Sequence, residues 1–124
     1  MERVHFLDHH GKRVLLMDCT GCDPDELIAV FDTVEKIVGQ ESGRTLLIVA
    51  DFTGAHFNKQ AADRMKVVAA KDRSHVHRAG LVGAAAIGDT YLREMESFSA
   101  RKFPTFPSRE QALDWVVAEH AAAS

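Results

Sequence analysis

The stretch Leu46-Leu-Ile-Val-Ala-Asp-Phe-Thr-Gly54 decides the fold class, because an apolar run passes through a tight turn into a helical pattern. Residues 45–50 carry no charge and are β-branched at Ile48 and Val49, which favours a central strand covered on both faces. The same ending, Asp-x-Thr-Gly, follows the run Val14–Met17 and includes both cysteines there. Ligands and partners of open α/β sheets bind beyond the carboxyl ends of the strands, so these two loops are the first candidates for function.

Five strand-like segments are predicted along the chain. Gly11 can adopt the positive φ of a tight turn, so the first two segments are expected to form an antiparallel hairpin. Pro104 cannot donate to a strand ladder, which places the last segment at an edge of the sheet. The glycine-rich stretch 79–83 has so little side-chain bulk that another group is expected to approach its backbone closely. The segments cover Val4–Leu7, Val14–Met17, Thr45–Ala50, Ala79–Ala86 and Lys102–Phe106.

Four helical segments alternate with these strands. Asp23-Pro-Asp-Glu26 supplies an N-cap, a proline at the first helical position and a capping glutamate, and Gly39 is expected to end that helix. The other three helices are predicted to start near Asn58, Asp89 and Ser108, and the third is expected to bury Leu92, Met95 and Phe98. The order ββαβαβαβα predicts one α/β domain over residues 1–124. Its mixed sheet has about five strands, largely parallel beyond the hairpin, and its alanine-rich tail is expected to fray.

Composition excludes several classes of function. The chain has 124 residues, of which 46% are hydrophobic, and this suits one domain that buries roughly two-thirds of its unfolded surface. A formal net charge of -3 with scattered lysines and arginines forms no basic stripe, so no nucleic acid is expected as a partner. No signal peptide pattern and no apolar run of ~18 residues occurs, so no membrane association is expected. The chain is therefore expected in the cytoplasm, where both cysteines are reduced.

The pair Cys19-Thr-Gly-Cys22 is the one candidate for enzymatic chemistry, as a thiol-disulfide oxidoreductase. Such a catalyst stabilises its thiolate at a helix N-terminus. Here both cysteines precede the predicted cap Asp23, and Asp18 adds negative charge that disfavours a thiolate. The second loop repeats Asp-x-Thr-Gly without a cysteine, as expected if Asp51 and Thr53 hydrogen-bond a tight turn in which Gly54 takes an unusual φ.

Seven histidines raise the question of a metal site. His9 and His10 are expected in the hairpin turn, where adjacent side chains diverge, and His75 and His77 have no third ligand at suitable spacing. The histidines are therefore interpreted as solvated surface residues, and neither a metal nor another cofactor is predicted.

The order of elements, the loop Leu46–Gly54, the strand Ala79–Gly83 and the ending Phe106-Pro-Ser-Arg-Glu-Gln-Ala-Leu-Asp-Trp115 together resemble the SpoIIAA-like branch of the STAS domain family. The resemblance covers nearly the whole chain. It implies a bacterial, non-catalytic regulatory module that binds a protein partner, as anti-sigma-factor antagonists do. Those antagonists are switched by phosphorylation of a serine at the start of the helix after the central strand, whereas this chain has no Asp-Ser-Ser-Gly there.

The resemblance therefore places a partner-binding surface on the loop after the central strand. The residues it implicates are Asp51, Thr53, Gly54, His56 and Asn58, with Thr53 as the one hydroxyl that could accept phosphate. Two alternatives remain open. In the first, Met65, Val68 and the glycine-rich strand border a pocket for a small apolar ligand beside Asp51. In the second, Cys19 and Cys22 are redox-active. A homodimer is compatible with each of these functions.

Overall fold

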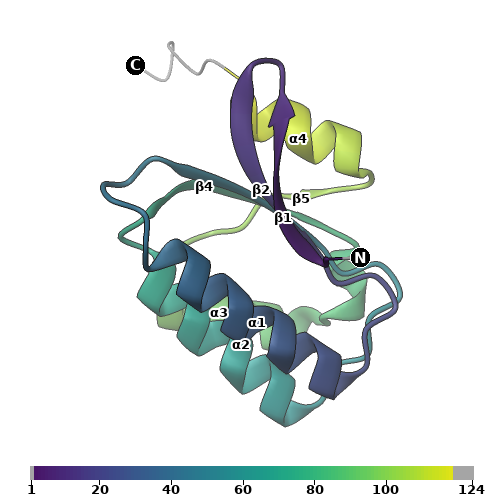
Figure 1. Ribbon diagram of the computed structural model, residues 1–124. Coiled ribbons are helices and arrows are strands. Elements are labelled where there is room, and N and C mark those ends of the chain that lie inside the picture. The colour runs from purple at the N-terminus through teal and green to yellow at the C-terminus, as the bar shows by residue number, and fades with distance from the viewer. Residues whose placement is uncertain (1, 119–124) are drawn as a thin grey trace.

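The computed structural model describes residues 2–118, which form a mixed sheet with helices on both faces (Figure 1). The strands are β1 (Val4–His9), β2 (Lys12–Asp18), β3 (Leu46–Asp51), β4 (Val76–Val82) and β5 (Thr105–Phe106). The helices are α1 (Pro24–Val38), α2 (Lys59–Asp72), α3 (Asp89–Ser99) and α4 (Arg109–Val117), with a short 3-10 helix at Ala84–Ala86. The predicted order ββαβαβαβα is confirmed. The alanine-rich tail after residue 118 lies outside the described residues.

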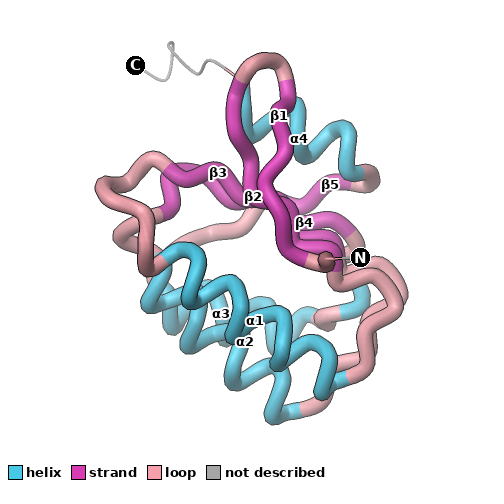
Figure 2. The backbone as a smooth tube through the Cα atoms, viewed as in Figure 1, coloured by secondary structure: helices cyan, strands magenta, loops and turns pink. Residues whose placement is uncertain are grey.

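Strand order follows chain order, β1-β2-β3-β4-β5. The β1–β2 pair is the predicted antiparallel hairpin, and each later neighbour pairs in parallel. Parallel crossovers are right-handed, so three crossovers that step in the same direction along the sheet put their helices on the same face. Figures 1 and 2 show this arrangement, with α1, α2 and α3 below the sheet and α4 alone on the other face. No helix in the described part is long and apolar enough to span a bilayer.

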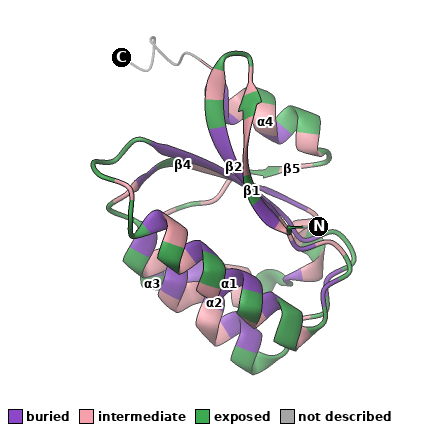
Figure 3. Cartoon of the chain, viewed as in Figure 1, coloured by how far each residue is buried: buried purple, intermediate pink, exposed green. Residues whose placement is uncertain are grey.

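Strand β3 lies at the centre, and all six of its residues are buried (Figure 3). Ile48 and Ala50 pack with the core beneath α1 to α3, whereas Leu47 and Val49 pack with the smaller core beneath α4. This alternation explains why the sequence reads as an unbroken apolar run: both faces of the strand are covered by helices.

The predicted helix starts are confirmed at three of the four helices. Asp23 and Glu26 form a capping box, in which Asp23 Oδ1 accepts from Glu26 N at 2.8 Å and Glu26 Oε1 accepts from Asp23 N at 2.9 Å. Asn58 caps α2 by accepting from Ala61 N, and Ser108 caps α4. Gly39 ends α1 as expected, but with an ordinary helical φ of -62°.

The predicted boundaries of two strands are wrong. Strand β4 begins three residues earlier than expected and ends at Val82, because Gly83 turns the chain at a φ of 67° into the 3-10 helix. Strand β5 is only two residues long, but it does form the sheet edge that Pro104 predicted. The expected close approach in β4 is confirmed: a Cβ on Gly80 would lie 3.1 Å from the Phe106 ring.

Helix α3 also differs from its prediction. Gly88, with a φ of 87°, is the N-cap, and Asp89 is the first helical residue. The negative charge of Asp89 interacts favourably with the positive end of the helix dipole there. Met95 and Ser99 are buried, and Ser99 satisfies its hydroxyl by donating to Met95 O at 2.7 Å. Phe98 points away from the core and is 56% exposed, contrary to the prediction from helical spacing.

A test of the turn after β4 compares two glycines with nearly the same φ. Gly83→Ala places its Cβ 2.5 Å from Thr53 N, whereas Gly21→Ala, at a φ of 66°, meets nothing within 4 Å. Backbone strain alone costs about 1 to 2 kcal/mol at each position. We expect Gly83→Ala to lower the free energy of unfolding by at least about 2 kcal/mol more than Gly21→Ala. Urea denaturation measures both, and equal losses would contradict the close contact between the two loops.

Candidate functional site

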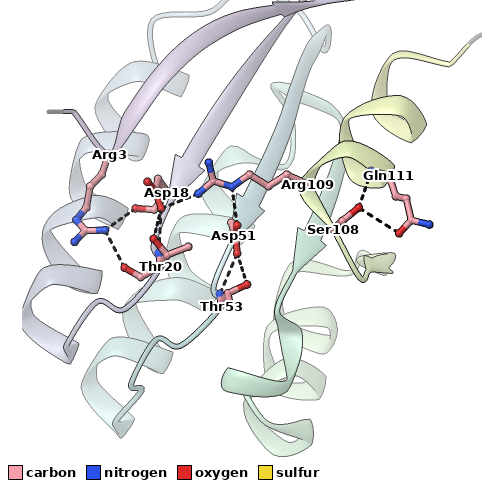
Figure 4. Close-up of polar contacts among 8 residues, drawn as sticks. All are labelled: Arg3, Asp18, Thr20, Asp51, Thr53, Ser108, Arg109 and Gln111. Carbon is pink, nitrogen blue, oxygen red and sulfur yellow. Dashed lines mark hydrogen bonds and ion pairs between the residues drawn. The ribbon is translucent and has the colours of Figure 1, made fainter.

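The two Asp-x-Thr-Gly loops adopt the same hydrogen-bonded turn at the carboxyl ends of β2 and β3 (Figure 4). Asp18 Oδ1 accepts from Thr20 N at 3.1 Å and from Thr20 Oγ1 at 2.6 Å. In the second loop, Asp51 Oδ1 accepts from Thr53 N at 3.0 Å and from Thr53 Oγ1 at 2.6 Å. The prediction that the repeated motif is turn chemistry is confirmed, because each aspartate is used by its own loop.

Backbone hydrogen bonds then join the loops side by side. The first loop pairs with the second beyond the end of the β2–β3 ladder, and the second pairs with the end of β4. The bonds run from Cys19 N to Asp51 O at 2.9 Å, from Gly21 N to Thr53 O at 2.9 Å, from His56 N to Cys22 O at 2.8 Å and from Phe52 N to Val82 O at 2.8 Å. These loops therefore continue the order of the sheet past its last paired residues.

Arg109 links the two aspartates. Its Nε donates to Asp51 Oδ2 at 2.6 Å, and its Nη2 lies 2.9 Å from Asp18 Oδ1 (Figure 4). Arg109 is the first residue of α4, on the opposite face of the sheet from α1 to α3, and it is 58 residues from Asp51 in sequence. The guanidinium fork therefore ties two strand ends to the helix that covers the other face. Nothing in the local spacing of the sequence identifies Arg109 as part of this site.

The contacts keep both carboxylates ionised. Burial raises the pKa of Asp51, but hydrogen bonds from Thr53 and Arg109 outweigh burial and hold the pKa below its usual value. Asp18 behaves alike: burial raises its pKa, while hydrogen bonds from Thr20 and the charge of Arg109 bring it below the usual value. A carboxylate with a lowered pKa is a poor general acid or base near neutral pH. The pair is suited to holding structure.

Two further contacts fix the edges of this cluster. Arg3 Nη1 donates to the backbone oxygens of Asp18 and Thr20, both at 3.1 Å, so the start of β1 is joined to the first loop (Figure 4). Ser108 Oγ accepts from Gln111 N at 3.2 Å, which orients the first turn of α4 and with it Arg109. The Ser108 hydroxyl in turn donates to Gln111 Oε1 at 3.3 Å.

Both cysteines are buried free thiols. They precede the cap Asp23, as predicted. Burial, reinforced by Cys22 and Asp18, raises the pKa of Cys19 well above its ordinary value. Burial also raises the pKa of Cys22, although Arg3 partly opposes the increase. Neither thiol meets the requirements of exposure and low pKa that thiol-disulfide exchange sets.

The predicted partner-binding residues divide into two groups. Thr53, Gly54, His56 and Asn58 are exposed around the second loop, whereas Asp51 is 5% exposed and held by Arg109 and Thr53. Asn58 also has a structural role, because its side chain caps α2. The structure therefore brings these residues together and leaves Thr53, Gly54 and His56 exposed, with the Thr53 hydroxyl bonded to Asp51 and the His56 side chain in no hydrogen bond that closes the turn.

An exposed aromatic residue that the sequence pattern did not indicate lies on α3. Phe98 of α3 is the one large hydrophobic residue exposed among residues 2–118, and the Lys66 ammonium lies 5.5 Å from its ring centroid. Lys66 is seven residues beyond Lys59, where α2 begins, which is about 10 Å along the helix axis. Helical spacing alone could not find it, because Phe98 and the buried Ser99 are adjacent in sequence.

Comparisons with known proteins identify the fold. No family model matches the chain, and no curated protein does so either. A solved structure does match: an uncharacterized protein from the DUF3478 family, from Shewanella loihica PV-4, with a SpoIIAA-like fold. The match has a TM-score of 0.68 and 15% sequence identity, and it covers 91% of each chain. This chain has a SpoIIAA-like fold. The likeness confirms the resemblance in architecture and shows no activity.

An apolar cavity of about 80 Å³ lies between the sheet of the SpoIIAA-like fold and helices α1 to α3. Met65, Val68 and part of β4 line it, as predicted, but Asp51 is not among its lining residues. Sites for drug-sized ligands have volumes of roughly 300 to 1,000 Å³. The cavity is therefore large enough for a few water molecules and too small for a lipid.

The side chains of the two hairpin histidines were expected to diverge, but they lie together. The rings of His9 and His10 stack, with centroids 4.2 Å apart and planes inclined by 11°. Both approach Asp114 of α4, whose Oδ1 lies 2.7 Å from His9 Nε2 and 3.9 Å from His10 Nε2. The expectation failed because His10 has a positive φ of 52°, which turns its side chain back over its neighbour.

The role of Arg109 can be tested by a double-mutant cycle. Arg109→Ala leaves Asp51 buried without its ion partner, and we expect a loss of about 2 kcal/mol in the free energy of unfolding, below the range for fully buried pairs because Arg109 is partly exposed. Asp51→Asn in the Arg109→Ala background should cost less than in the wild type, because the unpaired charge is removed. Arg93→Ala, at an exposed position of α3, is the control. Additive losses in the cycle would contradict the coupling.

Asp72 offers a test by pH. Burial, with the nearby charge of Glu35, raises the pKa of Asp72 to about 7, although Arg64 and Lys71 oppose the increase. The folded state therefore binds a proton that the unfolded state releases near its ordinary pKa, so the stabilisation is complete at low pH and is lost as the pH rises toward 7. Relative to Asp72→Asn, the wild type should lose up to about 4 kcal/mol between pH 4 and 8. A constant difference over that range would contradict this prediction.

Proposed function

We propose that the protein is a non-catalytic protein-interaction module, and that its partner docks on one defined surface. We call this surface the docking face; it consists of Thr53, Gly54 and His56 together with the outer sides of α2 and α3, including the partly exposed Lys66 and the exposed Phe98. The observation that carries the proposal is the contrast within the loop after β3. Asp51, at the start of the loop, is paired with Arg109, whereas the residues that follow it are exposed on a rigid backbone.

The chemistry of the site favours binding over catalysis. Asp18 and Asp51 are ionised and paired with Arg109, so neither is poised to donate or accept a proton near neutral pH. Cys19 and Cys22 are buried with raised pKa values. Because the two thiols are free, a reducing compartment suits them, and the proposal places the protein in the cytoplasm.

The rigidity of the second loop supports docking. Phe52 and Phe57 point inward from the two ends of the loop and pack with Phe31, with ring centroids 5.5 to 6.5 Å apart. Together with the backbone bonds to the first loop, this packing orders the segment before a partner binds. The loop therefore loses little conformational entropy on binding. Phe98 supplies the kind of exposed aromatic side chain on which interface energy concentrates.

Binding in the proposal needs no phosphorylation. The Thr53 hydroxyl donates to Asp51 Oδ1 at 2.6 Å. A phosphate on Thr53 would replace this donor by negative oxygens beside an ionised carboxylate, and the repulsion would open the turn. Phosphorylation of Thr53 is therefore proposed to oppose the docking geometry.

The experiment captures partners from the source cell with the immobilised protein and quantifies them by mass spectrometry. His56→Glu and Phe98→Ser each change one end of the docking face without removing a bond of the turn, and we expect either to reduce recovery of a specific partner at least about tenfold, as loss of a central contact does. Thr33→Glu is the matched control, because it adds the same charge at an exposed position on α1.

Unchanged recovery with both variants would remove this surface from consideration. Loss with Thr33→Glu as well would point to a general effect of charge. Light scattering of the purified protein tests whether a second copy of the chain occupies the docking face. A dimer that dissociates in Phe98→Ser would show that the partner is the protein itself.

A further inference from the structure

We infer that His9, His10 and Asp114 form a binding site for a borderline divalent transition-metal ion such as Zn²⁺. We call these three residues the hairpin triad. It lies where the tip of the β1–β2 hairpin meets α4, on the face of the sheet opposite α1 to α3 (Figure 1). The inference is independent of the proposed docking face, which lies on the other layer.

The backbone of the hairpin brings the two imidazoles together. His9 and Lys12 form the last pair of the β1–β2 ladder, so His10 and Gly11 are the two residues of the turn. Both have positive φ, 52° and 81°, as a type I′ turn requires. Asn-Gly is the preferred pair for such a turn, and histidine is, with Asn and Asp, one of the non-glycine residues found most often in the left-handed region. The result is a stacked pair of rings whose centroids are 4.2 Å apart.

Asp114 completes the triad from a distant part of the chain. It lies on α4, 105 residues after His9, and its Oδ1 faces both Nε2 atoms at 2.7 Å and 3.9 Å. One ligand atom from each of the three residues lies within 4.8 Å of the others. Tetrahedral Zn²⁺ with ligand distances of 2.0 to 2.2 Å holds its ligand atoms about 3.4 Å apart. Shifts of well under 2 Å would bring the ligand atoms to that spacing, together with a rotation of the stacked rings that turns both Nε2 lone pairs toward the ion.

The donor set selects the class of cation. Two imidazole nitrogens and one carboxylate oxygen suit Zn²⁺, Co²⁺, Ni²⁺ and Cu²⁺, whereas Mg²⁺ and Ca²⁺ prefer oxygen ligands alone. The side chains of His10 and Asp114 are 70% and 52% exposed, so water has access to the remaining coordination position. The arrangement of three protein ligands with an open position is the one that exchangeable or catalytic zinc sites use.

His10 distinguishes this inference from a simpler role for the cluster. The hydrogen bond between His9 and Asp114 alone would tie the hairpin to α4, and that task needs no second histidine. His10 adds nothing to that bond, yet its Nε2 approaches the same carboxylate oxygen from a strained backbone position. A metal ion uses all three groups.

The test is calorimetric titration of the full chain with ZnCl₂, supported by the visible absorption of Co²⁺. We expect one Zn²⁺ per chain, and at least about tenfold weaker binding in His10→Ala and in Asp114→Asn, since loss even of a supporting residue around a metal costs 10- to 100-fold. His10→Ala retains the His9–Asp114 hydrogen bond, so it separates metal binding from the attachment of the hairpin. His5→Ala removes an exposed histidine from the same strand and should leave affinity unchanged.

Circular dichroism and thermal unfolding without metal establish that each variant is folded. Equal Zn²⁺ affinity in the wild type, His10→Ala and Asp114→Asn would overturn the inference, as would the absence of Zn²⁺ binding by the wild type. Binding of Mg²⁺ as tight as that of Zn²⁺ would overturn the assigned class of cation.

Discussion

The guanidinium of Arg109 is the contact on which the arrangement of this molecule depends. Its two bonds reach Asp18 and Asp51, which already hold their own turns through Thr20 and Thr53. Without it Asp51 would be a buried charge with no ion partner. The first turn of α4 would also lose its polar attachment to β2 and β3, leaving the bonds of Arg78 to the last turn and of His9 to Asp114. The ion bridge helps to set the position of α4 against β2 and β3, and the packed helix in turn partly shields the bridge from water.

Local signals in the sequence were sufficient for most of the fold. The capping box at Asp23, the cap at Asn58 and the apolar run of β3 are each decided by neighbours within a few residues, and each was predicted correctly. Features that depend on distant partners were not predictable in this way. Arg109 meets Asp51 across 58 residues, and Asp114 meets His9 across 105. The prediction that Phe98 is buried was wrong for a related reason. Helical spacing cannot show whether Phe98 or the adjacent Ser99 will be buried by packing.

The paired loops illustrate how a repeated motif can divide its roles. Both copies use aspartate and threonine to close a turn, and in both the glycine that follows takes a positive φ. The first copy encloses two buried thiols, so it contributes to the interior. The second copy lies over the start of α2, where the chain must leave the sheet, and this position exposes Thr53, Gly54 and His56. Its proposed role in recognition follows from location, since the turn chemistry is shared.

The sequential strand order has a consequence for where any ligand could sit. Open α/β sheets bind small molecules in the crevice that forms where strand order reverses and successive loops part to opposite faces. From β2 to β5 this sheet contains no such reversal, because every crossover steps in the same direction. The loops at its carboxyl edge lie against one another and close with backbone bonds and an ion bridge. The topology thus turns the usual place for a small-molecule cleft into a continuous, pre-ordered surface.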